Sequence, residues 1–226
     1  MSRAEQYLAN IGNKFEQDGS VRFFPGNTVI SFINQKAPIF KLFCDVRKML
    51  QESIAGDCFA YMPDDSIHMT VFEGVCDQWR DESVWTKLLP TDVQLTEVDK
   101  LFERLFVQSP RLGEVHMRAI GIKADGGYGI SLLPCTQSDE QKLHTYRDQM
   151  SELFGIRFPN HDAYADHISI CYGIKAPTEE QEQELDRFEG KAAGYIAAKG
   201  VEFTVEQPDM TYFRSMYAFE KERFER

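Results

Sequence analysis

The sequence lacks the features that mark several large classes of protein. Its cysteines are odd in number and widely spaced, without a C-x-x-C pair: Cys44, Cys58, Cys76, Cys135 and Cys171. This spacing argues against a disulfide framework and against a zinc ribbon. No run reaches the ~18 consecutive apolar residues of a membrane span, and residues 1–19 have no apolar core of a signal peptide. We therefore expect a cytoplasmic protein with reduced cysteines and no membrane association.

Positive charge is scarce as well. The chain has 25 Lys and Arg against 36 Asp and Glu, a net charge of −11. Proteins that bind long polyanions normally carry the opposite sign. We expect a small nucleotide or short oligonucleotide as substrate, with long RNA disfavoured, and no obligate protein partner.

The length of 226 residues is long for one domain and short for two. A chain of this size buries roughly 70% of its unfolded surface, so its core requires neither disulfides nor a metal. No low-complexity linker interrupts it. We interpret residues 1–226 as a single bilobal domain, with His68 in the first lobe and His167 in the second.

Helical and strand-like segments alternate along the chain. Hydrophobic spacing predicts four helices, over 37–53, 96–108, 138–155 and 178–200. The second opens with Thr-x-x-Asp from Thr96, which is typical of a capped start, and Gly155 follows the third. β-branched and apolar runs predict strands from about Thr28, over 66–74, over 166–174 and over 201–222, with a hairpin over 114–134. This order predicts an α+β fold of two similar lobes, each an antiparallel sheet with helices on its outer face.

Two of the predicted strands carry the same motif. Residues 68–71 read His-Met-Thr-Val, and residues 167–170 read His-Ile-Ser-Ile. Because side chains alternate along a strand, each histidine shares a face with the hydroxyl residue two positions later, and the apolar residues take the other face. One such motif occurs often by chance. Two copies in matching places of the two halves indicate a functional pair.

Paired imidazoles and hydroxyls suit the cleavage of a phosphodiester. One neutral imidazole can take a proton from water or a ribose hydroxyl, and a second, protonated, can give one to the leaving oxygen. Hydroxyls can donate to the non-bridging phosphate oxygens and so position the phosphorus. The pattern predicts His68 and His167 as catalytic residues, with Thr70 and Ser169 as phosphate-binding residues and no cofactor.

On these motifs the sequence resembles the 2H phosphoesterase superfamily. That group includes RNA 2′,3′-cyclic phosphodiesterases, also described as 2′-5′ RNA ligase-like proteins, and enzymes that act on small cyclic nucleotides or 2′-5′ oligoadenylates. The stretch Phe-Pro-Gly-Asn-Thr-Val-Ile-Ser-Phe (24–32) resembles an uncharacterised bacterial branch. The resemblance implies a central groove between the lobes, no metal, and the roles named above for the motif residues. Ser169 stands where threonine is commoner, but its hydroxyl can do the same work.

Three further residues are candidates for substrate binding. Tyr212 and Arg214 share a face of a closing strand, where Arg214 would reach phosphate and Tyr212 would stack on a base. Phe72 follows Thr70 on the predicted site face and is a candidate groove wall. An ordinary edge strand and ordinary core packing explain these positions equally well.

Two rival functions remain open from the sequence. One is a module that binds a nucleotide or an RNA end in the same groove without catalysis. The other is a metal-dependent hydrolase centred on His161, Asp162, Asp166 and His167, four residues with metal-binding side chains in one short segment. Two intact histidine motifs favour the acid–base phosphodiesterase, because phosphate binding alone is better served by Arg or Lys.

Overall fold

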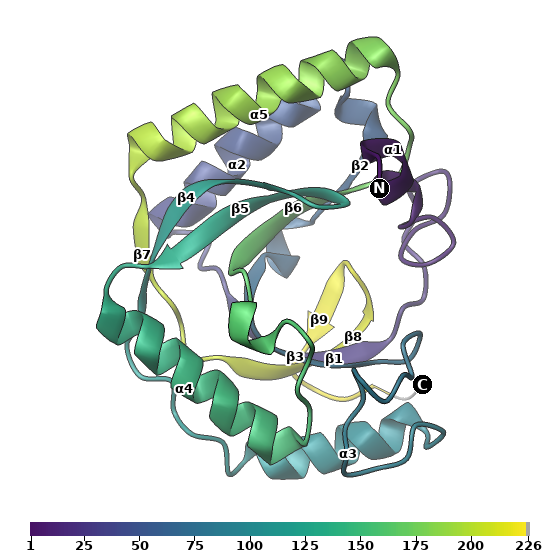
Figure 1. Ribbon diagram of the computed structural model, residues 1–226, viewed down its shortest axis with the longest axis vertical. Coiled ribbons are helices and arrows are strands. Elements are labelled where there is room, and N and C mark those ends of the chain that lie inside the picture. Colours follow the sequence, from purple (N-terminus) through teal and green to yellow (C-terminus); the bar gives the residue numbers. More distant parts are fainter. Residues whose placement is uncertain (225–226) are drawn as a thin grey trace.

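The computed structural model describes residues 1–224 and has an α+β architecture (Figure 1). Within these residues the five α-helices are α1 (Arg3–Leu8), α2 (Pro38–Gln51), α3 (Leu95–Phe106), α4 (Gln137–Phe154) and α5 (Glu179–Lys199). Short 3₁₀ turns occupy Gly56–Cys58, Asp64–Ser66 and His161–Ala163. The predicted fold class is confirmed.

A single antiparallel sheet of nine strands runs through the described part of the chain. Its strands are β1 (Gly26–Phe32), β2 (Phe59–Tyr61), β3 (His68–Cys76), β4 (His116–Ala124), β5 (Gly127–Pro134), β6 (His167–Gly173), β7 (Glu202–Thr204), β8 (Asp209–Ser215) and β9 (Ala218–Glu220). The order across the sheet is β7-β4-β5-β6-β3-β1-β8-β9, and β2 also pairs with β6. The sheet curls strongly, so that β4, β5 and β6 lie opposite β1, β3 and β8 (Figure 1).

The sheet has a joint between β3 and β6. One bridge pair, Met69 with Ile168, connects these strands, and β2 pairs with β6 further along, at Cys171–Gly173. We call β3, β1, β8 and β9 the His68 half, and β2, β4, β5, β6 and β7 the His167 half. Both Met69 and Ile168 are fully buried in one hydrophobic core that extends through both halves.

Helices cover the outer face of each half (Figure 1). On the His167 half, α2 packs against α5 and β7, and α5 packs against β4. On the His68 half, α3 packs against α4 and β8, while α4 spans the joint and contacts β3 and β5. The helix that follows β1 therefore covers the other half, and the last two strands return to the first. The two halves of the sheet are therefore interleaved along the chain.

The helix ends show which local signals the fold uses. α4 ends at Gly155, whose φ of 62° lies in the left-handed region that favours glycine, as predicted. The predicted cap at Thr96 is wrong, because α3 begins at Leu95 with Gln94 at its N-cap position and no side-chain cap bond. Asp99, the other half of that signal, is buried and accepts a hydrogen bond from Asn27 Nδ2 at 2.8 Å. The Asp99 side chain, which the sequence pattern assigned to a helix cap, therefore makes a tertiary contact instead.

Neither a disulfide nor a membrane-spanning helix occurs among the described residues. No disulfide joins any of the cysteines within residues 1–224. In the same range, none of the helices combines the length and apolar character that a membrane crossing requires.

Candidate active site

The joint of the sheet brings the two histidine motifs together. His68 and His167 are the first residues of β3 and β6. The bridge pair between these strands is formed by Met69 and Ile168, the residue that follows each histidine. The strands are antiparallel, so the two motifs lie side by side and run in opposite directions.

This register determines which motif residues lie across from one another. One position to either side of the bridge pair, His68 is aligned with Ser169, and Thr70 is aligned with His167. Directly opposed residues in an antiparallel pair have Cβ atoms roughly 4.5–5.5 Å apart. The bridge pair points into the core, so all four polar side chains point to the opposite face. We call these two imidazoles and two hydroxyls the square, in which each histidine is aligned with the hydroxyl residue of the other motif.

Both imidazoles are oriented by the same local hydrogen bond. His68 Nδ1 lies 2.7 Å from the carbonyl oxygen of Ser66, and His167 Nδ1 lies 2.9 Å from that of Ala165. A carbonyl oxygen only accepts, so Nδ1 must carry the proton in each ring. In the neutral state this leaves Nε2 of each histidine with a free lone pair. Each ring therefore presents the nitrogen that can exchange a proton with a ligand.

The two rings differ in their surroundings. Burial, together with a smaller effect of the nearby His167, lowers the pKa of His68 to about 4, although the hydrogen bond to the Ser66 carbonyl acts in the opposite direction. The ring centres of His68 and Phe219 are 4.3 Å apart. Burial and the positive charge of Lys123 lower the pKa of His167. Both imidazoles are therefore neutral near pH 7 without a ligand, and a bound phosphate would favour protonation of one of them.

A buried arginine on α4 connects the strands that carry the two motifs. Arg147 of α4 donates from Nε to the carbonyl of Val71 at 2.9 Å and forms an ion pair with Asp166, the residue before His167. Its guanidinium also lies 4.7 Å from the ring centre of Tyr164, and a side-chain hydrogen bond links Tyr164 to Thr70. This network holds β3 and the start of β6 in their relative positions. Sequence reasoning missed Arg147, although it interrupts the apolar face of its helix between Leu143 and Met150.

Close approach of β5 to β6 depends on a glycine beside the site. Gly129 pairs with Ser169. A Cβ at Gly129 would lie 2.9 Å from the Ile168 carbonyl oxygen and 3.6 Å from Cδ2 of His167. A larger residue there would push β5 away from the second motif.

The expected position of Phe72 is wrong because β3 has a bulge. Thr70 pairs with Ile30, but Phe72 pairs with the preceding Val29, so Val71 is an extra residue in the ladder. The bulge reverses the alternation of side chains beyond it. Phe72 is buried in the core, and Glu73 reaches the site face in its place.

The expected positions of Tyr212 and Arg214 are also wrong. Tyr212 belongs to the hydrophobic core. Arg214 lies outside the groove, 3.7 Å from Glu220 and with its guanidinium 4.1 Å from the ring centre of Phe224. Phe213, with the opposite parity on β8, faces the site instead. The prediction assumed that the face of β8 with Phe213 packs into the core. The wall of the site is itself aromatic, so that face borders the site.

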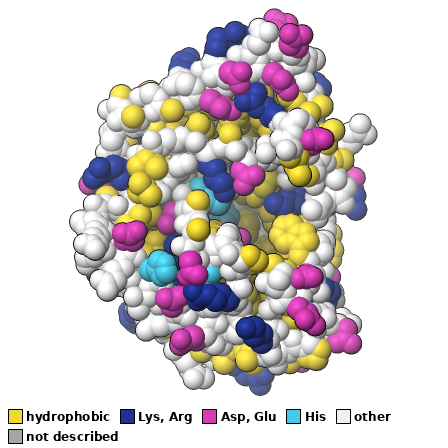
Figure 2. All heavy atoms as spheres, viewed as in Figure 1, with side chains coloured by type: hydrophobic (Ala, Val, Ile, Leu, Met, Phe, Trp, Pro, Cys, Tyr) yellow, Lys and Arg dark blue, Asp and Glu magenta, His cyan; other side chains and the backbone are white. Residues whose placement is uncertain are grey.

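A cavity of about 160 Å³ opens beside the first motif, with His68 and Thr70 on its wall. Six aromatic side chains contribute to the lining: Phe24, Trp79, Phe158, Tyr172, Phe213 and Phe219. Lys14 enters from the segment that follows α1, and its Nζ lies 4.6 Å from the centre of the Tyr172 ring. Figure 2 shows this face of the molecule hollowed near its middle, with hydrophobic side chains along one side of the hollow. No local pattern pointed to Lys14.

The proposed metal cluster of His161, Asp162, Asp166 and His167 does not assemble. Asp166 is paired with Arg147, and His167 bonds to a backbone carbonyl. His161 instead donates from Nε2 to Oδ1 of Asp148 at 2.9 Å.

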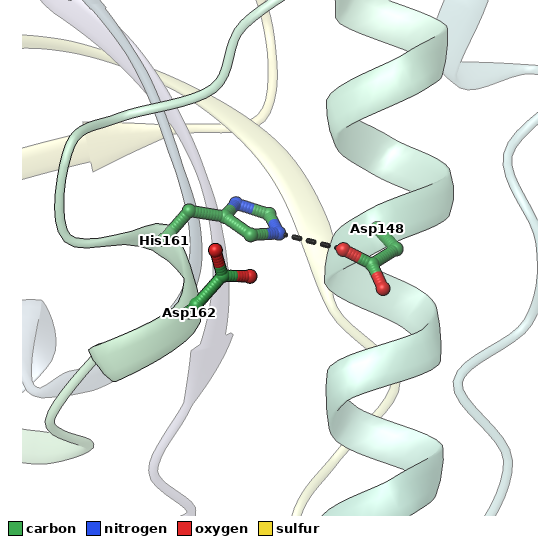
Figure 3. A group of neighbouring side chains, drawn as sticks. All are labelled: Asp148, His161 and Asp162. Atoms are coloured by element: carbon green, nitrogen blue, oxygen red, sulfur yellow. Dashed lines mark hydrogen bonds and ion pairs between the residues drawn. The ribbon is translucent and has the colours of Figure 1, made fainter.

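Within residues 1–224, the potential ligands that do gather are Asp148, His161 and Asp162, whose ligand atoms lie within 4.8 Å of one another (Figure 3). Arg157 forms ion pairs with both carboxylates, at 3.2 Å to Asp148 and 2.5 Å to Asp162. This group is explained as a surface ion-pair network.

Comparison with known proteins identifies the family. Residues 14–127, half of the 226-residue chain, match the family model 2H-phosphodiest, described as a domain of unknown function (DUF1868). The chain belongs to the 2H phosphoesterase superfamily. Membership supports a phosphodiesterase-like function. The matched range contains the His68 motif, whereas the His167 motif lies beyond it.

The fold is shared with a solved structure of a bacterial protein of unknown function. The crystal structure of the conserved protein of unknown function ATU0111 from Agrobacterium tumefaciens str. C58 matches with a TM-score of 0.83 and 24% sequence identity. The match covers 94% of this chain and 90% of that one. No curated protein matches the sequence significantly. The likeness establishes the architecture, and the roles of the motif residues remain predictions.

Proposed function

We propose that this protein is a metal-independent phosphodiesterase that opens a 2′,3′-cyclic phosphate or a related small nucleotide phosphodiester. The observation that supports this most directly is the register of the joint, which aligns His68 with Ser169 and Thr70 with His167. Each imidazole presents Nε2 on the same face. The whole chain acts as one catalytic unit, because the square draws two residues from each half.

The proposed reaction is an in-line attack of water on phosphorus. The neutral imidazole of one histidine takes a proton from the water at Nε2 while the water oxygen bonds to phosphorus. The bond from phosphorus to one ribose oxygen breaks, and the second histidine, protonated, gives that oxygen its proton. The product is a nucleoside monophosphate, and the two histidines end with exchanged protonation states.

The hydroxyls and nearby cations would hold the phosphate between the two rings. Thr70 and Ser169 lie next to the opposite histidine and can each donate to a non-bridging oxygen. The charges of Lys123 and Lys14 act on His167. A local positive field of this kind can attract one phosphate although the protein as a whole is acidic. We therefore infer a small nucleotide or short oligonucleotide substrate rather than long RNA.

The decisive experiment is a substrate screen with identified products. The purified protein is incubated with the four 2′,3′-cyclic nucleotides, ADP-ribose cyclic phosphate and 2′-5′ oligonucleotides, and the position of the product phosphate is determined. His68→Ala and His167→Ala proteins serve as controls against contaminating activity. We expect turnover of at least one substrate by the wild type alone, unchanged by EDTA.

Two results would redirect the proposal. Binding without turnover of any substrate would leave a nucleotide-binding module. Loss of activity in EDTA, restored by a divalent ion, would show that the two histidines do not suffice for catalysis.

A further inference from the structure

The cavity beside His68 contains one carboxylate that the proposed reaction does not use. The bulge at Val71 brings Glu73 to the cavity wall, in a strand that is otherwise apolar around it. The side chain is partly buried. Within residues 1–224, no hydrogen bond or ion pair engages the carboxylate. Burial raises its pKa, and the charges of Lys123, Arg147 and Lys14 act in the opposite direction. A partly buried carboxylate without a hydrogen-bond donor is costly, so an acceptor kept there is available to a ligand.

Two other polar side chains of this wall, outside the His68 motif, already have partners. Asn27 donates to Asp99 and accepts from the backbone N–H of Val75 at 3.0 Å. The Thr28 hydroxyl donates to the carbonyl of Phe72 at 3.2 Å. Outside the His68 motif, Glu73 is therefore a carboxylate on this wall that remains available to a bound molecule.

The shape of the cavity suits a flat ring. Its aromatic lining offers faces on which a planar group can stack, as nucleobases do on aromatic side chains. A volume of about 160 Å³ is below the roughly 300 Å³ of the smaller pockets that enclose whole ligands. The cavity thus fits one part of a nucleotide, and it adjoins the histidine pair where the phosphate would lie.

We propose that this cavity binds the base of a guanine nucleotide and that Glu73 is the residue that selects it. The guanine ring N–H and the adjacent exocyclic amino group both donate toward one side, which matches the two oxygens of an ionised carboxylate. Lys14, whose Nζ reaches the same cavity, can donate to the carbonyl oxygen beside that ring N–H. This inference rests on the proposed function only in placing the phosphate at His68 and His167.

The other bases fit this wall less well. Adenine and cytosine each offer one amino group next to a ring nitrogen that accepts, and uracil offers one N–H between two carbonyls. Each of these bases would direct a lone pair at the Glu73 carboxylate. A site rejects a ligand that leaves its buried polar groups unpaired, and this gives the selectivity. The expected discrimination is about 10- to 100-fold, in the range of one good bidentate contact.

Binding of product nucleotides tests this without requiring turnover. Dissociation constants of 3′-GMP, 3′-AMP and 3′-IMP are measured by calorimetry, with Trp79 fluorescence as a second readout because this side chain lines the cavity. We expect 3′-GMP to bind about 10- to 100-fold more tightly than 3′-AMP. The 3′-IMP value should lie between them, since inosine keeps the ring N–H and lacks the amino group.

The matched variants are Glu73→Gln and Glu97→Gln. The first keeps the shape but replaces one acceptor with a donor, so the guanine preference should fall to about threefold or less. The second changes an exposed glutamate on α3 and should retain the preference. The melting temperature of Glu73→Gln should not fall, because the substitution removes a poorly solvated charge.

Several outcomes would overturn the inference. These are equal binding of 3′-GMP and 3′-AMP by the wild type, no binding of either, or a guanine preference that persists in Glu73→Gln. If that variant fails to fold, the order of the three ligands on the wild type still decides. Guanine-selective binding with no hydrolysis of any cyclic nucleotide would overturn the proposed function alone. Equal binding with efficient hydrolysis of all bases would overturn this inference alone.

Discussion

The two halves of the sheet orient their histidines in the same way and surround them differently. In both, Nδ1 bonds to the carbonyl two residues earlier, at 2.7 Å for His68 and 2.9 Å for His167. His68 then lies against Phe219 beside the aromatic cavity, whereas His167 lies in the field of Lys123. The motif determines which nitrogen is presented. The rest of each half determines the polarity around it and what can bind next to it.

This difference separates two tasks that a phosphodiesterase must combine. The His68 half offers a pocket for an apolar, planar part of the substrate. The His167 half contributes the charge of Lys123, which acts on His167. A repeated motif can therefore provide symmetrical acid–base chemistry within a site that still holds its substrate in one direction.

If both halves of the sheet contribute to catalysis, neither histidine can be removed without loss of activity. His68→Ala and His167→Ala should each lower kcat by roughly 10²–10⁴-fold, because each removes one partner of the proton exchange. The double variant should lose little more than the worse single one, since groups that act as a unit are not additive. Turnover of a 2′,3′-cyclic nucleotide is measured for all three proteins, with circular dichroism to verify folding. Near wild-type turnover in either single variant would contradict the mechanism.

His144→Ala is the matched control for these variants. His144 is about half exposed on α4, 3.6 Å from Asp148, and should be replaceable without a change in kcat.

The ion pair between Arg147 and Asp166, which links the two halves, should contribute strongly to the free energy of unfolding. Arg147→Met leaves Asp166 buried without its ion pair and should lower the free energy of unfolding by about 3–5 kcal/mol. The control Arg187→Met removes an exposed pair with Glu184 and should cost less than about 1 kcal/mol. Both are measured by urea denaturation. Equal effects of the two variants would show that Arg147 does not hold the halves together.

The hydroxyls test whether the square is symmetrical. Thr70→Val and Ser169→Ala should each lower kcat/KM by about 10²-fold, as expected for one donor to a charged oxygen. Thr70→Ser keeps the hydroxyl and should retain most activity. Tyr164→Phe removes the partner of Thr70 and tests whether that hydrogen bond contributes. A large effect at one position and none at the other would confine phosphate binding to one half.

The pH dependence should reveal the lowered pKa values. Catalysis needs one neutral and one protonated imidazole, so kcat/KM should follow a bell-shaped curve. Activity falls on the acid side as the base is protonated, and on the alkaline side as the acid loses its proton. Burial lowers the pKa of His68 to about 4 and also lowers that of His167, so the optimum of kcat/KM should lie below ~6.5. The kcat curve should lie at higher pH, because bound phosphate raises the pKa of the acid. An optimum of kcat/KM above pH 8 would contradict the structure.

The smallest expected effect concerns chain length and salt. A site for one phosphate should hydrolyse a mononucleotide and a ~20-mer with the same terminal cyclic phosphate at similar kcat/KM. Each additional phosphate contact on a single strand would steepen the salt dependence by roughly 0.7 log unit per tenfold change in salt. The two substrates are compared across a salt series. A strong preference for the long RNA with a steep slope would indicate a basic surface outside the square.

Much of the architecture followed from local patterns. The helices predicted over 138–155 and 178–200 occur as Gln137–Phe154 and Glu179–Lys199, because their spacing and caps are local signals. The strands predicted over 66–74 and 166–174 occur as His68–Cys76 and His167–Gly173. Alternation along a strand placed each histidine and its hydroxyl on one face, and this could be derived without knowing the partner strand.

The failures have a common cause in contacts between distant segments. The bulge at Val71 depends on the register with β1, and it exchanges Phe72 for Glu73 on the site face. The side of β8 that faces the cavity depends on the curl of the sheet, which buries Tyr212 and turns Arg214 away. An alternating pattern shows that the two faces of a strand differ. It does not show which face borders the site when the site, like the core, is lined by aromatic rings.

By itself, the sequence determined the two motifs, the shared face of each histidine and its hydroxyl residue, and the net charge of −11. Only the tertiary structure decided that β3 pairs with β6 through Met69 and Ile168, and that Lys14, Glu73 and Arg147 gather around the result. The reason is physical. Side-chain periodicity within a strand is encoded in neighbouring residues, whereas the pairing between strands is set by the packing of the whole core.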